Sequence, residues 1–165
     1  MPLFENDNWV EDRWQLLADD EPLPAHGAVI ISLARLAEIE NFAGELGVEI
    51  TNTVRVEEIA PYFAKIKLIR LPFPAFTDGR AYSLARQLRE YGFTGILRAS
   101  GNILPDQLQM MRQVGFNSFE IAERFTTETL NQASGHIRAA YQTNYLEPQA
   151  ARLAIWKARS EKRLG

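Results

Sequence analysis

Polar side chains gather in three segments that each follow a predicted strand and open a predicted helix. Arg80, Arg98 and Arg124 supply guanidinium groups there, and Asp78 and Asp106 supply carboxylates. The start of a helix offers free N–H groups and the positive end of the helix dipole, so an anion bound there is stabilised, and an arginine adds a bidentate grip. The candidate anion-binding residues are therefore Asp78, Arg80, Arg98, Asn102, Asp106 and Arg124.

The same side chains also have structural interpretations, which compete with the binding one. Asp78 is the expected N-cap of a helix that starts near Gly79, and Asp106 follows Pro105 at a favourable position in the first turn of another. Arg98 ends an apolar strand, where a charged group needs a partner or a cleft. It either forms a structural ion pair with Asp78 or Asp106, or it binds an anion.

Motifs that specify a cofactor or a metal are missing from the sequence. Neither the glycine pattern of dinucleotide-binding turns nor that of the phosphate-binding P-loop occurs. His26 and His136 lack the spacing of a zinc pair, and a chain without cysteine has no thiol nucleophile and no thiolate ligand. We therefore expect no cofactor and no metal, and no residue is assigned a catalytic role.

A short apolar run followed by a helical period recurs five times along the chain. The predicted strands are 28–33, 48–51, 67–71, 95–99 and 118–121. In the first predicted helix the apolar positions are Leu36, Ile39, Ala43 and Leu46, followed by Gly47. Pro61 should kink or shorten the second helix, near 56–65. The remaining apolar helix faces lie within 81–88, 104–111 and 130–141, and Thr126 or Thr127 caps the last of them.

Strand followed by helix, repeated five times, predicts an α/β fold with a mainly parallel sheet, because each return between parallel strands needs a covering crossover. Two architectures fit this pattern: a doubly wound open sheet and a partial α/β barrel. The length of 165 residues favours the open sheet, because a closed barrel usually takes about 250 residues. In both, ligands meet the loops that follow the carboxyl ends of the strands.

The two ends of the chain carry opposite charge. We expect one α/β domain over 1–165, with an N-terminal strand or hairpin arm (1–25) and a C-terminal basic helix (149–163). The arm holds seven acidic residues and one basic residue, and residues 148–165 hold five basic residues and one acidic residue. The apolar side chains of the C-terminal helix spread around it, which favours packing against a second copy as a homodimer. Its five basic charges are too few to favour nucleic-acid binding.

Composition excludes a membrane protein and favours a cytoplasmic one. The chain is 46% hydrophobic and 24% charged, and no apolar run approaches the roughly 18 residues of a membrane span. The first residues lack both the cationic start and the apolar stretch of a signal peptide. With no cysteine to form disulfides, a reducing compartment is the expected location.

Residues 73–121 resemble a bacterial family known as domain of unknown function 934. The resemblance runs through the strings FTDGR at 76–80 and YSLAR at 82–86, and continues through LRA at 97–99. Members are labelled probable oxidoreductases of sulfite reduction because their genes lie beside the sulfite reductase gene. The resemblance therefore implies an accessory protein of assimilatory sulfite reduction, within sulfur metabolism, that acts with sulfite reductase.

The alternative is a small α/β enzyme that binds an anionic metabolite at the loops after the strands. Arg80 and Arg98 would then grip the anion and Asp78 or Asp106 would act as the acid–base group, which requires these side chains to converge in one cleft. Family members commonly carry lysine and aspartate where this chain has Ala75 and Asn102. The resemblance thus implies a pathway more strongly than a reaction, and whether the protein is an enzyme stays open.

Overall fold

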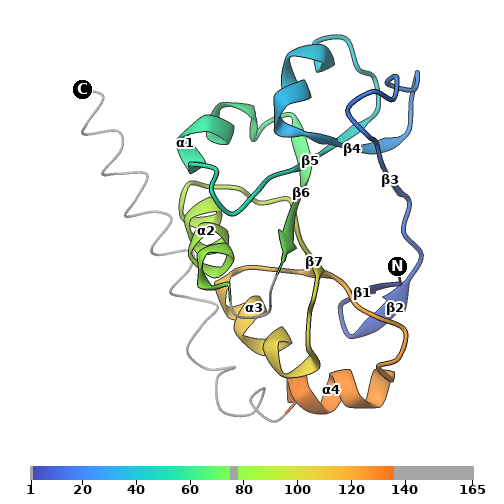
Figure 1. The fold of residues 1–165 in the computed structure, drawn as a ribbon, viewed down its shortest axis with the longest axis vertical. Helices are drawn as coiled ribbons and strands as arrows, with labels where there is room; N and C mark the ends of the chain where they lie inside the picture. The colour runs from blue at the N-terminus through green and yellow to red at the C-terminus, as the bar shows by residue number, and fades with distance from the viewer. Residues whose placement is uncertain (1, 75–77, 136–165) are drawn as a thin grey trace.

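The computed structural model describes residues 2–74 and 78–135, which form an α/β fold around a mainly parallel sheet (Figure 1). Six neighbouring strands run parallel: β3 (Trp14–Leu16), β4 (Ala28–Ser32), β5 (Glu45–Glu49), β6 (Ile66–Phe73), β7 (Ile96–Gly101) and β8 (Ser118–Glu120). A hairpin of β1 (Leu3–Glu5) and β2 (Asn8–Val10) adds antiparallel to β8. The predicted α/β class and parallel sheet are confirmed.

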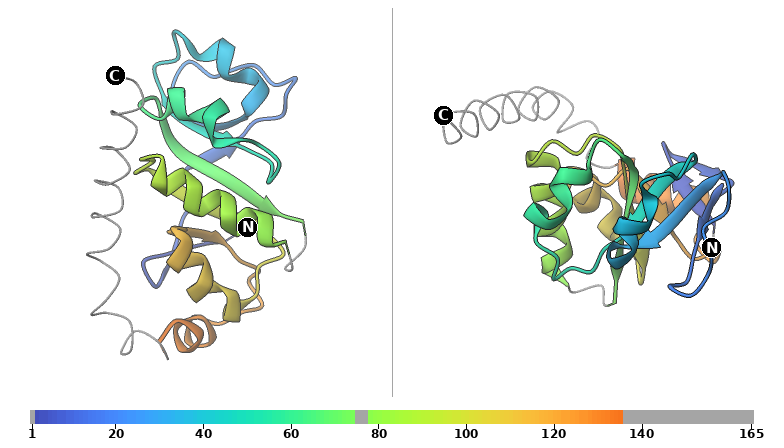
Figure 2. Two further views of the ribbon diagram at one scale, coloured as in Figure 1. Left: turned by 90° about the vertical axis from the view of Figure 1, so that its left-hand side faces the viewer. Right: turned by 90° about the horizontal axis from the view of Figure 1, so that it is seen from above.

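The order of the strands identifies the architecture as a partial barrel. The sheet reads β2-β1-β8-β7-β6-β5-β4-β3, so from β3 to β8 each strand adds beside the one before it. A doubly wound sheet, which chain length favours, would need the order to reverse once so that helices cover both faces. Here helices α1 (Val56–Ile59), α2 (Gly79–Glu90) and α3 (Leu108–Val114) lie on one face (Figure 2).

The N-terminal arm shows why the sheet must curl. Val10 ends β2 at one edge of the sheet, and Trp14 begins β3 at the other edge. Four residues of chain span at most roughly 14 Å, whereas the strand-to-strand steps between these edges would span roughly 33 Å in a flat sheet. The two edges therefore approach each other, and residues 11–13, which we call the strap, bridge them.

The sheet has two faces of different character. On the helix side, Leu97, Ala99 and Phe119 join a large core together with the buried face of α2, which consists of Ala81, Leu84, Ala85 and Leu88 as the helical period predicts. On the opposite face, which we call the concave face, a small apolar cluster of Trp14, Ile30 and Leu68 packs near the amino ends of the strands. Successive strand residues alternate between these faces.

One predicted helix is wrong over part of its length. The first crossover is a 3-10 helix, η1 (Leu33–Ile39), and Leu46 and Gly47 belong to β5. Leu46 fits a helical spacing but equally fits the alternation of a strand. Gly47 is required by packing and does not end a helix: a Cβ at this position would lie 2.9 Å from Ile30 Cγ1.

Other predicted boundaries are confirmed. Pro61 does shorten its helix, because α1 ends at Ile59 and a 3-10 turn, η2 (Ala60–Tyr62), follows it. A further 3-10 turn, η3 (Pro105–Gln107), precedes α3. Helix α3 ends at Gly115, whose φ of 114° lies in the left-handed region. Helix α4 (Thr127–Gly135) follows β8, and Thr126 Oγ1 accepts a hydrogen bond from the Thr129 amide at 3.2 Å. The predicted C-terminal helix at 149–163 lies outside the described residues.

Candidate functional site

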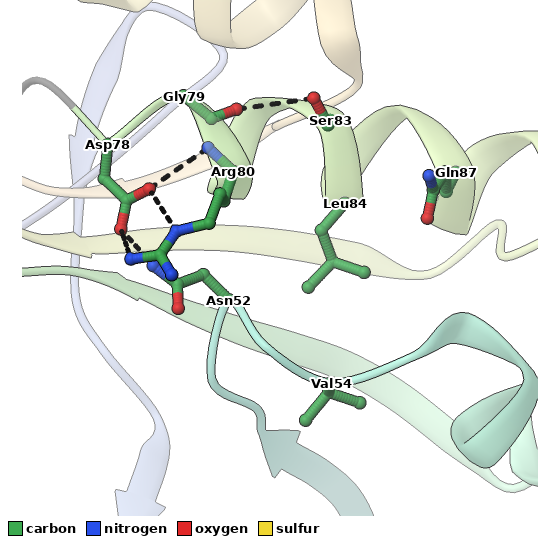
Figure 3. Close-up of a pocket in the computed structure, with 8 residues that line it drawn as sticks. All are labelled: Asn52, Val54, Asp78, Gly79, Arg80, Ser83, Leu84 and Gln87. Atoms are coloured by element: carbon green, nitrogen blue, oxygen red, sulfur yellow. Dashed lines mark hydrogen bonds and ion pairs between the residues drawn. The ribbon is translucent and has the colours of Figure 1, made fainter.

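A groove of about 580 Å³ lies between the loop after β5 and the first half of α2 (Figure 3). Its lining residues are Asn52, Val54, Asp78, Gly79, Arg80, Ser83, Leu84 and Gln87. Val54 and Leu84 give it an apolar part, and the remaining side chains are polar. The groove stands at the carboxyl ends of β5 and β6, where ligands meet sheets of this type.

Asp78 is held in the groove by hydrogen bonds that position α2. Its Oδ1 accepts from the backbone N–H of Arg80 at 3.1 Å and from Arg80 Nε at 3.2 Å, and Asn52 Nδ2 donates to Oδ2 (Figure 3). The hydrogen bond from the Arg80 side chain lowers the pKa of the Asp78 carboxyl. Asp78 is thus the N-cap that the sequence predicts. Arg80 remains 69% exposed at the rim of the groove.

Arg98 lies elsewhere, sealed on the concave face with 1% of its side chain exposed. Its Nη1 donates to Asp12 Oδ2 at 2.9 Å and its Nε donates to Ser118 Oγ at 3.1 Å. Glu120 Oε1 lies 3.9 Å from Nη1. The predicted partners Asp78 and Asp106 are therefore wrong, because side-chain alternation along β7 turns Arg98 away from the helix side of the sheet, where α2 lies.

Arg98 belongs to a row of polar residues that crosses five neighbouring strands. The strand register aligns Ser32 with Glu49, Glu49 with Arg70, Arg70 with Arg98, and Arg98 with Ser118. Two further carboxylates accept hydrogen bonds from the arginines of this row: Glu120 from Arg70, and Asp12 from Arg98. We call these residues the polar layer: Asp12, Ser32, Glu49, Arg70, Arg98, Ser118 and Glu120.

Arg70 joins the carboxylates of the polar layer. Its Nε and Nη2 donate to the two carboxylate oxygens of Glu120 at 2.7 and 2.8 Å, and its Nη1 donates to Glu49. The hydrogen bond to Glu120 is the main reason that the pKa of Arg70 is raised. Sequence reasoning missed the role of Arg70 and Glu49. The available signal was that each is a charged residue inside an apolar strand, as Arg98 is.

The other candidate residues do not line the groove. Asn102 Nδ2 donates to the Pro74 carbonyl at 3.3 Å, and Asp106 lies exposed in the first turn of η3. The Arg124 guanidinium lies 4.8 Å from the centre of the Phe125 ring. Among the six predicted anion-binding residues, the structure thus brings only Asp78 and Arg80 together in the groove, and it places Arg98 on another face of the sheet.

Comparisons with known proteins identify a family. A model of the family described as "Bacterial protein of unknown function (DUF934)" matches residues 47–152, which include most of β5, all of β6 to β8, and the groove. No curated protein matches the chain. Within residues 2–74 and 78–135, no group of three metal-ligating side chains occurs, and no helix is both long and apolar enough to span a membrane. Because the matched residues make up more than half of the sequence, the chain belongs to this family of bacterial proteins of unknown function.

Proposed function

We propose that this protein is a noncatalytic accessory protein of assimilatory sulfite reduction that acts with sulfite reductase. The pathway rests on the family resemblance, whose implied gene neighbour is sulfite reductase. The proposal for an accessory role rests on one observation: the two side chains that the enzyme alternative needs most, Asp78 and Arg98, are bound to other residues in separate places.

The contacts of Asp78 argue against a role in proton transfer. Its carboxylate accepts hydrogen bonds from Arg80 and Asn52, and the pKa of the group is lowered by Arg80. A general base works best when its pKa lies near the working pH, so a carboxyl with a lowered pKa is a poor one. Arg98 is sealed beneath the strap and cannot reach an anion in the groove without leaving its partners.

The groove supplies a surface that a protein partner could contact. The exposed guanidinium of Arg80 stands at its rim, and the half-buried Val54 supplies apolar surface there (Figure 3). Arginine beside apolar side chains is typical of the residues that carry binding energy in interfaces. Arg86 is an exposed arginine of the same helix that does not line the groove, and it offers a matched control.

The experiment is a pull-down of purified sulfite reductase on the immobilised full-length chain at physiological salt. We expect capture by the wild-type chain, loss of capture by Arg80→Glu, and retention by Arg86→Glu. Sulfite turnover by the reductase, measured with and without the chain, provides a second readout. Absence of capture together with unchanged turnover would contradict the proposed function.

A second candidate function is a small α/β enzyme that binds an anionic metabolite in the groove. One observation favours it: Arg80 is 69% exposed, and a Cβ on Gly79 would meet no atom within 4 Å, so the start of α2 is open. Calorimetric titration with sodium sulfite tests whether the groove binds an anion, which the enzyme requires and the accessory role does not. Binding that disappears in a folded Arg80→Ala variant would support the enzyme.

The proposal includes two expectations that follow from the sequence. A cytoplasmic location places the protein beside the reductase. A homodimer formed through the helix predicted at 149–163 gives a complex of two copies, and sedimentation of the full chain measures this directly. A monomer at micromolar concentration would contradict the dimer without affecting the partnership.

A further inference from the structure

Three polar groups on the concave face have no hydrogen-bond partner among the described residues: the buried hydroxyls of Ser32 and Ser100, and one guanidinium nitrogen of Arg98. Ser100 is fully buried, and its Oγ accepts and donates no hydrogen bond there. Arg98 uses Nε and Nη1, whereas its Nη2 makes no hydrogen bond to any described residue. Buried polar groups are rarely left unpaired, because each costs the free energy of its lost hydration.

The Ser100 hydroxyl and the Arg98 guanidinium lie on the same side of β7. Residues two apart on a strand share a face and lie roughly 7 Å from each other, and Ala99, which stands between them, belongs to the core on the helix side. Both unpaired groups can donate: a guanidinium nitrogen has only N–H donors, and a serine hydroxyl has one. A ligand that satisfies both must therefore present acceptor oxygens.

The polar layer already carries a surplus of negative charge. Two guanidinium groups, Arg70 and Arg98, face three carboxylates, those of Asp12, Glu49 and Glu120. An added anion would increase this surplus inside a region of low dielectric constant, at a large electrostatic cost. Replacement of one of the carboxylates avoids most of this cost: a monovalent anion would leave the charge unchanged, and a divalent anion such as sulfate would add one negative charge instead of two.

Asp12 is the carboxylate that can leave. It belongs to the strap, its neighbours Glu11 and Arg13 are exposed, and its own side chain is 28% exposed. The strap is fixed on both sides, since Trp9 Nε1 donates to Thr127 Oγ1 at 2.9 Å and Trp14 is buried in the concave face. Within the strap, Arg13 donates two hydrogen bonds to Glu45 in an exposed ion pair. A movement confined to residues 11–13 would therefore break this exposed pair and the contact of Asp12, and would expose Arg98 without dismantling the sheet.

We propose that the concave face beside Arg98 and Ser100 is a binding site for a small oxyanion, which enters by replacing the carboxylate of Asp12. The bound anion accepts from the Nη1 and Nη2 groups of Arg98 and from the hydroxyl of Ser100. The site is distinct from the groove, and it does not depend on an association with sulfite reductase.

The test is calorimetric titration of the full chain with sodium sulfate at constant ionic strength. Asp12→Asn keeps the acceptor for the Trp14 amide but removes the competing charge, so sulfate should bind at least roughly tenfold more tightly than to the wild type. Asp20→Asn removes the same charge from an exposed turn and should bind sulfate as the wild type does. Equal affinities in the Asp12→Asn and wild-type chains would overturn the proposal.

Two further variants locate the anion. In the Asp12→Asn background, Ser100→Ala should weaken sulfate binding several-fold, and Arg80→Ala should leave it unchanged. An unchanged affinity in Ser100→Ala, or a loss of binding in Arg80→Ala, would place sulfate outside the proposed site and overturn the proposal.

The wild-type chain provides a readout that needs no variant. The Trp14 backbone amide donates to Asp12 Oδ1 at 3.0 Å, so release of Asp12 from Arg98 must alter its environment. When sodium sulfate replaces sodium chloride at constant ionic strength, the Trp14 amide resonance should shift with saturation behaviour. A resonance that stays fixed would contradict exchange at Arg98 even if the variants fail to fold.

Discussion

The groove and the polar layer both contain an arginine close to an aspartate, but their surroundings make the two pairs physically different. In the groove, Arg80 is 69% exposed and its partner Asp78 lies two residues away in the chain. In the polar layer, Arg98 is 1% exposed and its partner Asp12 lies 86 residues away. An exposed pair is screened by water and contributes little stability, whereas a sealed charge depends on its partners.

This difference separates positions that can change freely from positions that hold the fold. Loss of Arg80 leaves a carboxylate that water and Asn52 still satisfy. Loss of Arg98 leaves Ser118 without its donor and removes the tie between the strap and β7. The largest effects on stability are therefore expected in the polar layer, and surface recognition is expected at the groove.

The largest predicted effect is that of Arg98→Ala. We expect it to lower the free energy of unfolding by ~2–4 kcal/mol, because it removes the cation that Asp12 and Ser118 contact in a sealed region. Urea unfolding followed by circular dichroism measures the change. Arg80→Ala is the matched control and should stay within about 0.5 kcal/mol of the wild type. Similar losses in the two variants would remove the distinction between the regions.

A somewhat smaller loss of stability is predicted for Gly47→Ala, because Gly47 packs against the apolar cluster of the concave face. The added Cβ would lie 2.9 Å from Ile30 Cγ1 and 3.2 Å from Leu68 Cδ2, and both side chains are buried. Overpacking of this kind typically costs ~1–3 kcal/mol. The same urea titration provides the value, and a variant as stable as the wild type would show that the concave face is loosely packed.

The opposite sign is predicted for Gly79→Ala at the groove. A Cβ at this position meets no atom within 4 Å, and the residue begins α2. Replacing a glycine whose backbone conformation alanine can adopt should stabilise the fold by ~0.4–1 kcal/mol through the unfolded state. A destabilised variant would indicate that the groove is more tightly packed than its structure implies.

The smallest predicted effect is a change in acid stability at Asp78. The pKa of this carboxyl is lowered in the folded protein, so its contribution is present above the ordinary carboxyl pKa of about 3.9 and is lost as pH falls through the lower folded value. Asp78→Asn keeps an acceptor at the cap but does not titrate. Between about pH 5 and pH 2, its thermal midpoint should therefore fall less than that of the wild type. If the thermal midpoints of the two proteins fell equally with pH, the ionisation of Asp78 would not stabilise the fold.

Local patterns predicted much of the parallel sheet and the buried face of α2. Ala81, Leu84, Ala85 and Leu88 follow a helical period, and Asp78 stands where an N-cap is needed, so short-range chemistry was sufficient. It was not sufficient at Leu46, whose position suits both a helix and a strand. There the close packing of Gly47 against Ile30, a contact between strands, decides the outcome.

The partner of Arg98 could not be predicted because it depends on the curl of the whole sheet. Asp12 reaches Arg98 only when the edges formed by β2 and β3 approach each other, and no local pattern encodes that closure. The length of the chain favours an open sheet only if the alternative is a closed barrel, which takes about 250 residues. A partial barrel needs fewer residues, so this argument does not exclude it. The sequence did indicate that a charge at the end of an apolar strand needs a partner, and the structure supplies it from the strap.

The most direct test of this account is a double-mutant cycle between the strap and the polar layer. Asp12→Asn removes the charge of the strap, and Arg98→Met removes the guanidinium while keeping most of its aliphatic volume. We predict a coupling free energy of at least about 1 kcal/mol in urea unfolding, because the two side chains share a hydrogen bond beside a sealed guanidinium. Strictly additive losses would contradict the claim that Asp12 and Arg98 hold the strap across the concave face.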